Sequence, residues 1–193
     1  MFDPLPPEPP ALTPKARAIL DAASELFYEN GIHAVGVDTI SEHAGVTKKT
    51  LYDRFGSKDR LVVAYLNERD RLWRGFLADH RTAAAASPSA QVAAVFTAAS
   101  EWSRTRAPRG CATINARAEI TSPEHPAYDV IIEQKRWMLD LFRGLAADAG
   151  VDDPSLVADR IMLLHEGAQV SAGFGTIADP FAEAGAAAVE LLR

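Results

Sequence analysis

The sequence predicts an all-α protein, in which an N-terminal three-helix helix-turn-helix domain is joined by a long helix to a larger C-terminal helical domain. Apolar residues recur at three- and four-residue intervals along most of the chain, which is the period of an amphipathic helix. Glycines, and Thr or Asp residues followed by proline, divide the chain into helix-sized segments. No segment has a convincing strand pattern, and no internal repeat is evident.

The first helix is marked at both ends. Thr13 suits the N-cap and Pro14 the first helical position. The pair Asn30-Gly31 has the residue types that a left-handed C-cap favours. Between these ends the apolar residues at helical spacing are Ile19, Ala23, Leu26 and Phe27.

Two short helices follow. The second is expected over about residues 37–44, and Gly45 breaks it. Thr47 can cap a third helix over about residues 48–55. Leu51 is expected to point inward and to anchor this helix.

The rest of the chain also reads as helices. A long fourth helix is expected over about residues 58–80. Residues 111–120 are ambiguous, because their apolar residues alternate as in a strand. High alanine content and the lack of any partner strand favour a helix there. The other helices are expected over about residues 89–104, 128–149 and 154–173, with a last one starting at about 180.

Composition narrows the class of protein. The chain has 193 residues, a net charge of −6 and a single cysteine, Cys111, which excludes an internal disulfide and fits a reducing cytoplasm. Residues 1–13 have no basic start and no apolar core, so they are not a signal peptide. Their prolines predict a flexible proline-rich arm. We expect no membrane segment and a cytoplasmic protein.

The positive charge is local. Residues 47–60 hold five basic and two acidic residues, a net charge of +3, whereas the whole chain is acidic. Three short helices with a tight Gly-Val-Thr turn between the second and third describe a helix-turn-helix. A local basic patch on an acidic body suits a small anionic footprint better than general adhesion to polyanions.

This pattern favours binding to duplex DNA. A recognition helix must be short, present its first turn outward and be anchored from behind. Exposed lysines can contact guanine or phosphate, and hydroxyl groups can hold phosphates. The free backbone N–H groups at the start of the fourth helix also attract phosphate. The residues that we expect to contact DNA are Thr47, Lys48, Lys49, Thr50, Tyr52 and Lys58. The alternative for two adjacent lysines alone is a solvated helix face.

The segment AGVTKKTLYDRFGSKDRL, preceded by ILDAASELFYENGIHAV, resembles the N-terminal domain of TetR family transcriptional regulators. The resemblance covers residues 15–60, and the remainder matches only in helical layout and length. It implies a DNA-binding domain over residues 14–60 and an effector-binding and dimerisation domain over residues 61–193. It also implies the DNA contacts named above. Val35-Gly36 departs from the family, which often has a hydroxyl residue there.

The resemblance further implies a homodimer that binds a near-palindromic operator. Its effector would be an unknown, partly apolar small molecule. For the dimer contact the last two helices offer Leu156, Leu163, Leu164, Ala186, Ala187, Val189 and Leu192. The alternative for each is the core of a single chain.

A ligand pocket in the C-terminal helices is likewise implied. Aromatic and apolar residues would line it, and polar residues at helical spacing would orient a ligand. The residues that we expect in the pocket are Phe96, Trp102, Cys111, Asn115, Trp137, Met138, Leu141, His165 and Gln169. Glu119 lies on the same stripe as Cys111 and Asn115. The alternative is that the aromatic residues are core and that the buried histidine is simply hydrogen-bonded.

Other classes of function find little support. The five histidines are scattered and form no metal-ligand pair, and no glycine-rich phosphate loop appears. We therefore expect no metal, no cofactor and no catalytic site. The prediction is a ligand-responsive repressor, released from its operator by a small molecule. The alternatives are a sensor or carrier of the same fold that does not bind DNA, and an all-α enzyme centred on Cys111 or His165.

Overall fold

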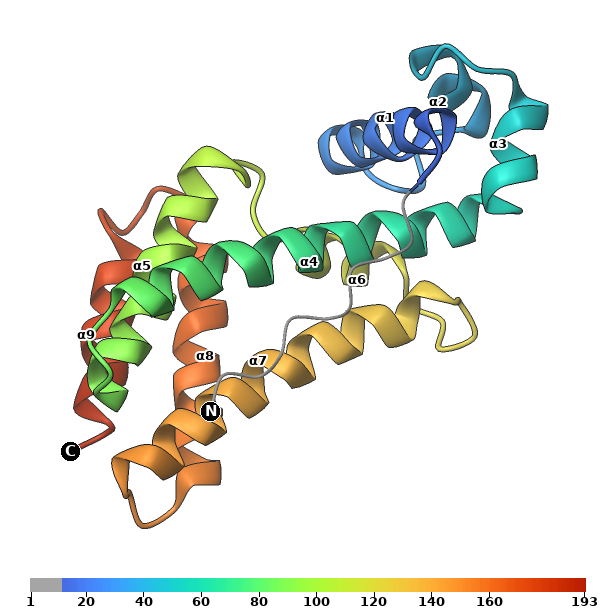
Figure 1. Ribbon diagram of the computed structural model, residues 1–193. Helices are drawn as coiled ribbons and strands as arrows, with labels where there is room; N and C mark the ends of the chain where they lie inside the picture. The colour runs from blue at the N-terminus through green and yellow to red at the C-terminus, as the bar shows by residue number, and fades with distance from the viewer. Residues whose placement is uncertain (1–11) are drawn as a thin grey trace. The chain divides into compact units, whose positions relative to one another are not determined.

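The computed structural model describes residues 12–193, so the predicted arm over residues 1–13 lies almost wholly outside the described residues. The described part contains nine α-helices and no strand, which confirms the all-α prediction (Figure 1). The helices are α1 (Pro14–Asn30), α2 (Val37–His43), α3 (Lys48–Phe55), α4 (Lys58–Ala83), α5 (Pro88–Thr105), α6 (Ala112–Glu119), α7 (Ala127–Ala149), α8 (Pro154–Ala172) and α9 (Pro180–Glu190).

The chain divides into two compact units. Unit 1 comprises the described residues up to Arg71 together with Ala112–Ile132. Unit 2 comprises Leu72–Cys111 and Glu133–Arg193. The helices α4 and α7 contribute residues to both units, because each crosses a boundary between them.

Side-chain caps set the helix starts that the sequence predicts. The Thr13 hydroxyl accepts a hydrogen bond from the backbone N–H of Ala16, 3.4 Å away. The carboxylates of Asp153 and Asp179 accept bonds of 3.0 Å at the starts of α8 and α9. Each bond satisfies one of the N–H groups that a helix start leaves without an internal partner.

Two helices are longer than predicted. The helix α4 continues to Ala83 instead of ending near residue 80. The three added residues are Arg81, Thr82 and Ala83, and the helix ends at the first of four consecutive alanines. The helix α5 starts at Pro88, and the Ser87 hydroxyl caps it.

The ambiguous segment over residues 111–120 forms the helix α6. Its buried residues Ala112, Ala116 and Ile120 lie four apart, so a helical turn places them on one face. The helical interpretation is therefore confirmed.

Unit 1 has a continuous apolar core. It collects residues from α1 to α4, α6 and the start of α7. The rings of Phe27 and Tyr65 lie 5.7 Å apart, and Ile40, Leu51 and Leu61 have no exposed surface. Burial of such side chains stabilises the fold by about 1.5–3 kcal/mol each, which fixes the three short helices on α4.

In unit 2, α9 packs against both α5 and α8 (Figure 1). A Cβ atom at Gly185 would lie 3.0 Å from Cβ of Phe96, so glycine allows α9 to approach α5 closely. The rings of Trp73 and Trp102 meet edge to face at 5.6 Å. Within residues 12–193, no helix combines the length and the apolar character that crossing a bilayer would require.

Candidate functional site

The turn before α3 positions the predicted recognition helix. Gly45 has φ +63°, a conformation that glycine adopts without strain. The chain then reaches Thr47, whose hydroxyl accepts a hydrogen bond of 3.1 Å from the backbone N–H of Thr50. This cap fixes the first turn of α3 where the sequence predicts it.

The helix α3 is anchored on one side and open on the other. Leu51 is completely buried against the unit 1 core, and Phe55 is half-buried behind it. Lys48 and Lys49 are exposed, and Tyr52 keeps 42% of its surface exposed. The first turn of α3 is therefore presented to solvent over an apolar base, as the sequence predicts.

The two lysines differ in their surroundings. Lys48 Nζ lies 3.0 Å from the carboxylate of Asp38 on α2. The hydrogen bond to Asp38 and its negative charge raise the pKa of Lys48. Lys49 makes no ion pair with any described residue. An exposed pair contributes little to stability, so Lys48 can exchange Asp38 for an anion.

The remaining predicted contacts lie nearby. The hydroxyls of Thr47 and Thr50 are 2.9 Å apart, and Thr50 is half-buried. Lys58, also half-buried, begins α4. The Ser57 hydroxyl accepts a hydrogen bond of 3.1 Å from the Arg60 N–H. Their roles in DNA binding stay predictions.

A brace that sequence reasoning missed supports this site within unit 1. The carboxylate of Glu119 accepts hydrogen bonds from the backbone N–H groups of Ile32 and His33, at 2.9 and 2.7 Å. Burial opposes ionisation of this carboxyl, but the hydrogen bonds outweigh it and lower its pKa. Glu119 therefore holds α6 on the loop that connects α1 to α2. Ile32 and Glu119 are 87 residues apart, and no local sequence pattern predicts their contact.

The predicted pocket residues fall into several environments. In unit 2, His165 packs against Phe96, with ring centroids 5.8 Å apart, and Met138 is completely buried. Leu141 and Gln169 are half-buried.

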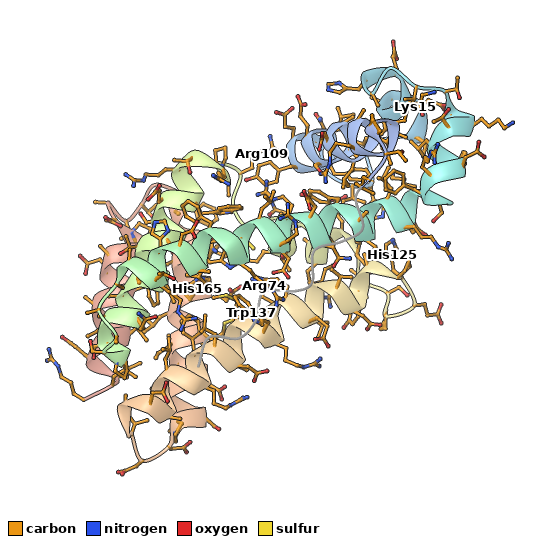
Figure 2. All side chains as sticks on the ribbon, in the orientation of Figure 1. Lys15, Arg74, Arg109, His125, Trp137 and His165 are labelled. Atoms are coloured by element: carbon orange, nitrogen blue, oxygen red, sulfur yellow. The ribbon has the colours of Figure 1, made fainter. Side chains whose placement is uncertain are left out.

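Three other predicted pocket residues have contacts of their own. Trp137 lies under the guanidinium of Arg74, 4.1 Å from its ring centroid (Figure 2). Trp102 packs on Trp73. Asn115 is exposed on α6 and belongs to unit 1, whereas Cys111 belongs to unit 2. A ligand-binding role for all these residues stays a prediction.

Unit 2 also contains a polar chain that the sequence did not predict. Lys135 Nζ lies 2.7 Å from one carboxylate oxygen of Glu166 and 3.7 Å from Cys111 Sγ. The other oxygen lies 3.2 Å from His165 Nδ1. Burial opposes ionisation of Glu166, but the His165 hydrogen bond and the Lys135 charge outweigh it and hold its pKa at about 2.

The described residues contain no group of His, Cys, Asp and Glu side chains that could hold a metal ion.

Comparison with known proteins gives a consistent result. Residues 19–65 match the model of the family "Bacterial regulatory proteins, tetR family". A solved structure of SCO4454, a TetR-family transcriptional regulator from Streptomyces coelicolor, is 32% identical with a TM-score of 0.85. That alignment covers 93% of this chain and 95% of the other.

Two curated relatives match over the N-terminal region. The HTH-type transcriptional activator FasR of Mycolicibacterium smegmatis is 50% identical over 48 residues, which are 25% of this chain and 22% of FasR. The HTH-type transcriptional repressor KstR2 of Rhodococcus jostii is 39% identical over 61 residues, which are 32% of this chain and 26% of KstR2. The match thus spans about a quarter of these relatives.

These relatives are transcriptional regulators, which argues against the alternative of an all-α enzyme. The similarity to SCO4454 extends along nearly the whole of both chains, so it includes the C-terminal helices that the N-terminal motif does not reach. The chain belongs to the TetR family of bacterial transcriptional regulators.

Proposed function

We propose that the protein is a homodimeric DNA-binding repressor that a small molecule releases from its operator. The observation that carries this proposal is the first turn of α3. Lys48, Lys49 and Tyr52 are exposed there, and buried Leu51 holds the helix from behind. A short, anchored helix with cations on its open face has the shape and charge that the major groove accepts.

Charge distribution supports the same proposal. The chain carries a net charge of −6, whereas residues 47–60 carry +3. The acidic remainder repels phosphates away from α3, which suppresses non-specific binding. A DNA-binding role also accounts for the cytoplasmic location that we propose.

Dimerisation is supported by an apolar stripe on α8. Leu156, Leu163 and Val170 lie seven residues apart and expose 45%, 73% and 48% of their surfaces. Phe174 and Ile177 extend the stripe beyond the helix and are also exposed. Leu192 is buried within the chain, so for that residue the core alternative applies. A two-fold contact through this stripe would pair two α3 helices for two half-sites of a near-palindromic operator.

Release requires that the effector bind two conformations of the dimer unequally. The helix α4 contributes residues to both units, so it is the element that we propose to carry the change. Tilting of α4 would alter the separation of the two recognition helices. We propose repression, because a dimer that covers an operator can block transcription without further contacts.

A binding titration tests the proposal. The purified full-length protein is titrated against labelled DNA from upstream of its own gene, and against a scrambled duplex of equal length. We expect the first to bind at least about a thousandfold more tightly at physiological salt, the lower end of the usual ratio of specific to non-specific affinity. A reporter gene behind the same DNA should be expressed more strongly when the regulator is deleted. Equal affinity for both duplexes would contradict the proposal.

A further inference from the structure

The buried imidazole of His165 is the starting point. His165 lies on α8 and exposes 2% of its surface. Its ring packs against the rings of Phe96 and Phe142, with both centroids 5.8 Å away. Figure 2 shows where it lies on the ribbon. The side chain is thus a polar group in an apolar interior.

Among the residues that the structure describes, only one of its two nitrogens has a partner. Nδ1 faces an oxygen of Glu166, 3.2 Å away, and the other oxygen of that carboxylate is paired with Lys135. An ionised carboxylate can only accept a hydrogen bond, so Nδ1 carries the proton. In the neutral form of the ring with this tautomer, Nε2 is an acceptor. It is buried and has no partner among the described residues. Buried polar atoms are normally satisfied, so an orphaned one calls for an explanation.

The ring of Phe96 connects this atom to a surface groove. Phe96 packs on His165 and also lines a groove of about 490 Å³ between α5 and α9. Gly185 of α9 leaves no space for a Cβ atom beside Phe96, so the ring sits between α9 and the imidazole. A rotation of the Phe96 side chain would remove one of the two rings that cover the imidazole.

The lining of the groove indicates the class of ligand. Its apolar part comes from α5 and α9: Ala93, Phe96, Phe181, Ala182, Ala186 and Val189. Its charged residues are of both signs: Glu101, Arg104, Asp179, Glu190 and Arg193. Three are acidic and two are basic, a net charge of only −1, so no strong field of one sign selects an ion. The acceptor at Nε2 instead selects a hydrogen-bond donor.

We infer that this groove and His165 form a binding site for an uncharged, mainly apolar compound with a hydroxyl group, such as a phenol. The hydroxyl donates to His165 Nε2, and the ring or chain of the compound takes the place that Phe96 vacates. The inference names the class of effector for the proposed function and in that respect rests on it.

A matched pair of probes tests the site without altering the protein. Phenol and toluene have nearly the same shape, but only phenol donates a hydrogen bond. Isothermal titration with the protein should show phenol binding about two- to tenfold more tightly, the equivalent of one net hydrogen bond. The ¹⁵N resonance of His165 Nε2 should shift with phenol. Equal affinities, or no binding of either probe, would overturn the inference and leave an internal water as the partner of Nε2.

Variants locate the contact. His165→Phe keeps an aromatic ring between Phe96 and Phe142 but removes the acceptor, and it should abolish the preference for phenol. Ser155→Ala, which removes an exposed hydroxyl of the same helix α8 outside the groove lining, should preserve it. The opposite pattern would refute the role of His165. If His165→Phe fails to fold, the comparison of phenol with toluene and the Nε2 resonance in the native protein still test whether phenol binds to His165.

The site and the proposed function fail in distinguishable ways. Phenol that binds through His165 without changing DNA affinity would leave the site intact and contradict its role as an effector site. A regulator that binds its operator but does not prefer phenol would keep the DNA-binding proposal and lose this site. Phe96→Ala should increase the association rate of phenol, and an unchanged rate would rule out this route of entry.

Discussion

Lys48 and Lys49 are the first two residues of α3, but among the described residues only Lys48 has an ion pair, so we expect them to contact DNA differently. Lys48 must exchange its contact with Asp38, 3.0 Å away, for any contact with DNA. Lys49 has no ion pair among the described residues and is free to reach a base edge. Lysine at that position can donate to the O6 and N7 atoms of guanine, which gives sequence preference.

Substitution of Lys49 by alanine should therefore relax sequence preference. We expect a loss of about 1–3 kcal/mol on the preferred operator and a smaller loss on scrambled DNA. Fluorescence anisotropy on both duplexes measures the two losses. Arg136→Ala, which removes an exposed cation of α7, serves as the control and should change neither. An equal loss on both duplexes would mean that Lys49 contacts phosphate only.

The lowered pKa of Glu166 predicts how the folding stability depends on pH. Burial disfavours its charge, but the His165 hydrogen bond and Lys135 lower its pKa from 4.5 to about 2. A lowered carboxyl pKa stabilises the folded state above the unfolded pKa, and this contribution is lost as the pH falls towards the folded value. Glu166→Gln should cost about 1.5–3 kcal/mol at pH 7, the usual contribution of hydrogen bonds to a charged group. Its denaturant midpoint should also fall less than that of the native protein between about pH 5 and pH 2. Parallel pH profiles would contradict the pairing.

At the residue scale, the sequence predicts what is local. The exposure of Lys49 and the burial of Leu51 follow from their spacing on one short helix. The contact between Lys135 and Glu166 joins residues 31 apart on different helices. No sequence pattern predicts the Lys135–Glu166 contact, or that Nε2 of His165 has no partner among the described residues, because both depend on how the helices pack.

Among the elements, α3 depends most on a single anchor. Leu51 is completely buried in the unit 1 core. Leu51→Ala should destabilise the protein by about 2–5 kcal/mol through the cavity it leaves. It should also reduce DNA affinity, because α3 loses the buried anchor that holds it in place. The Leu51 side chain itself is buried and cannot touch DNA.

Thermal unfolding and amide hydrogen exchange of α3 measure this effect. Asp53→Ala, at an exposed position of the same helix, should leave unfolding nearly unchanged. Full DNA affinity in a folded Leu51→Ala protein would show that α3 needs no anchor.

Helix boundaries were predictable where a cap or a glycine marks them. Thr47 caps α3 as the sequence predicts, and Gly56, with φ +77°, follows its last residue. The helix α4 runs three residues past its predicted end, where no cap or glycine marks the boundary in the sequence. The role of α6 could not be read from sequence, because Glu119 reaches back 87 residues to the N–H of Ile32.

For the whole molecule, the stripe on α8 decides the proposed oligomeric state. Leu163 exposes 73% of its surface, the largest fraction along this stripe within α8. Leu163→Glu should convert the dimer to monomers, because a charge in an apolar contact goes unpaired. DNA affinity should also fall, because a monomer can bind only one half-site of the operator. Ala147→Glu, at an exposed position of α7, is the control of equal charge. A Leu163→Glu protein that stays dimeric by sedimentation would place the interface elsewhere.

The claim that α3 enters a DNA groove is tested most directly by the salt dependence of operator binding. Each neutralised phosphate lowers log K by about 0.9 per unit of log salt concentration. We predict a steep slope for the native protein. Lys58→Ala should reduce the slope by about one and weaken all sequences alike. Leu51→Ala should abolish specific binding. An affinity for its own upstream DNA that does not change with salt, or that survives the loss of both Lys49 and Lys58, would contradict the account.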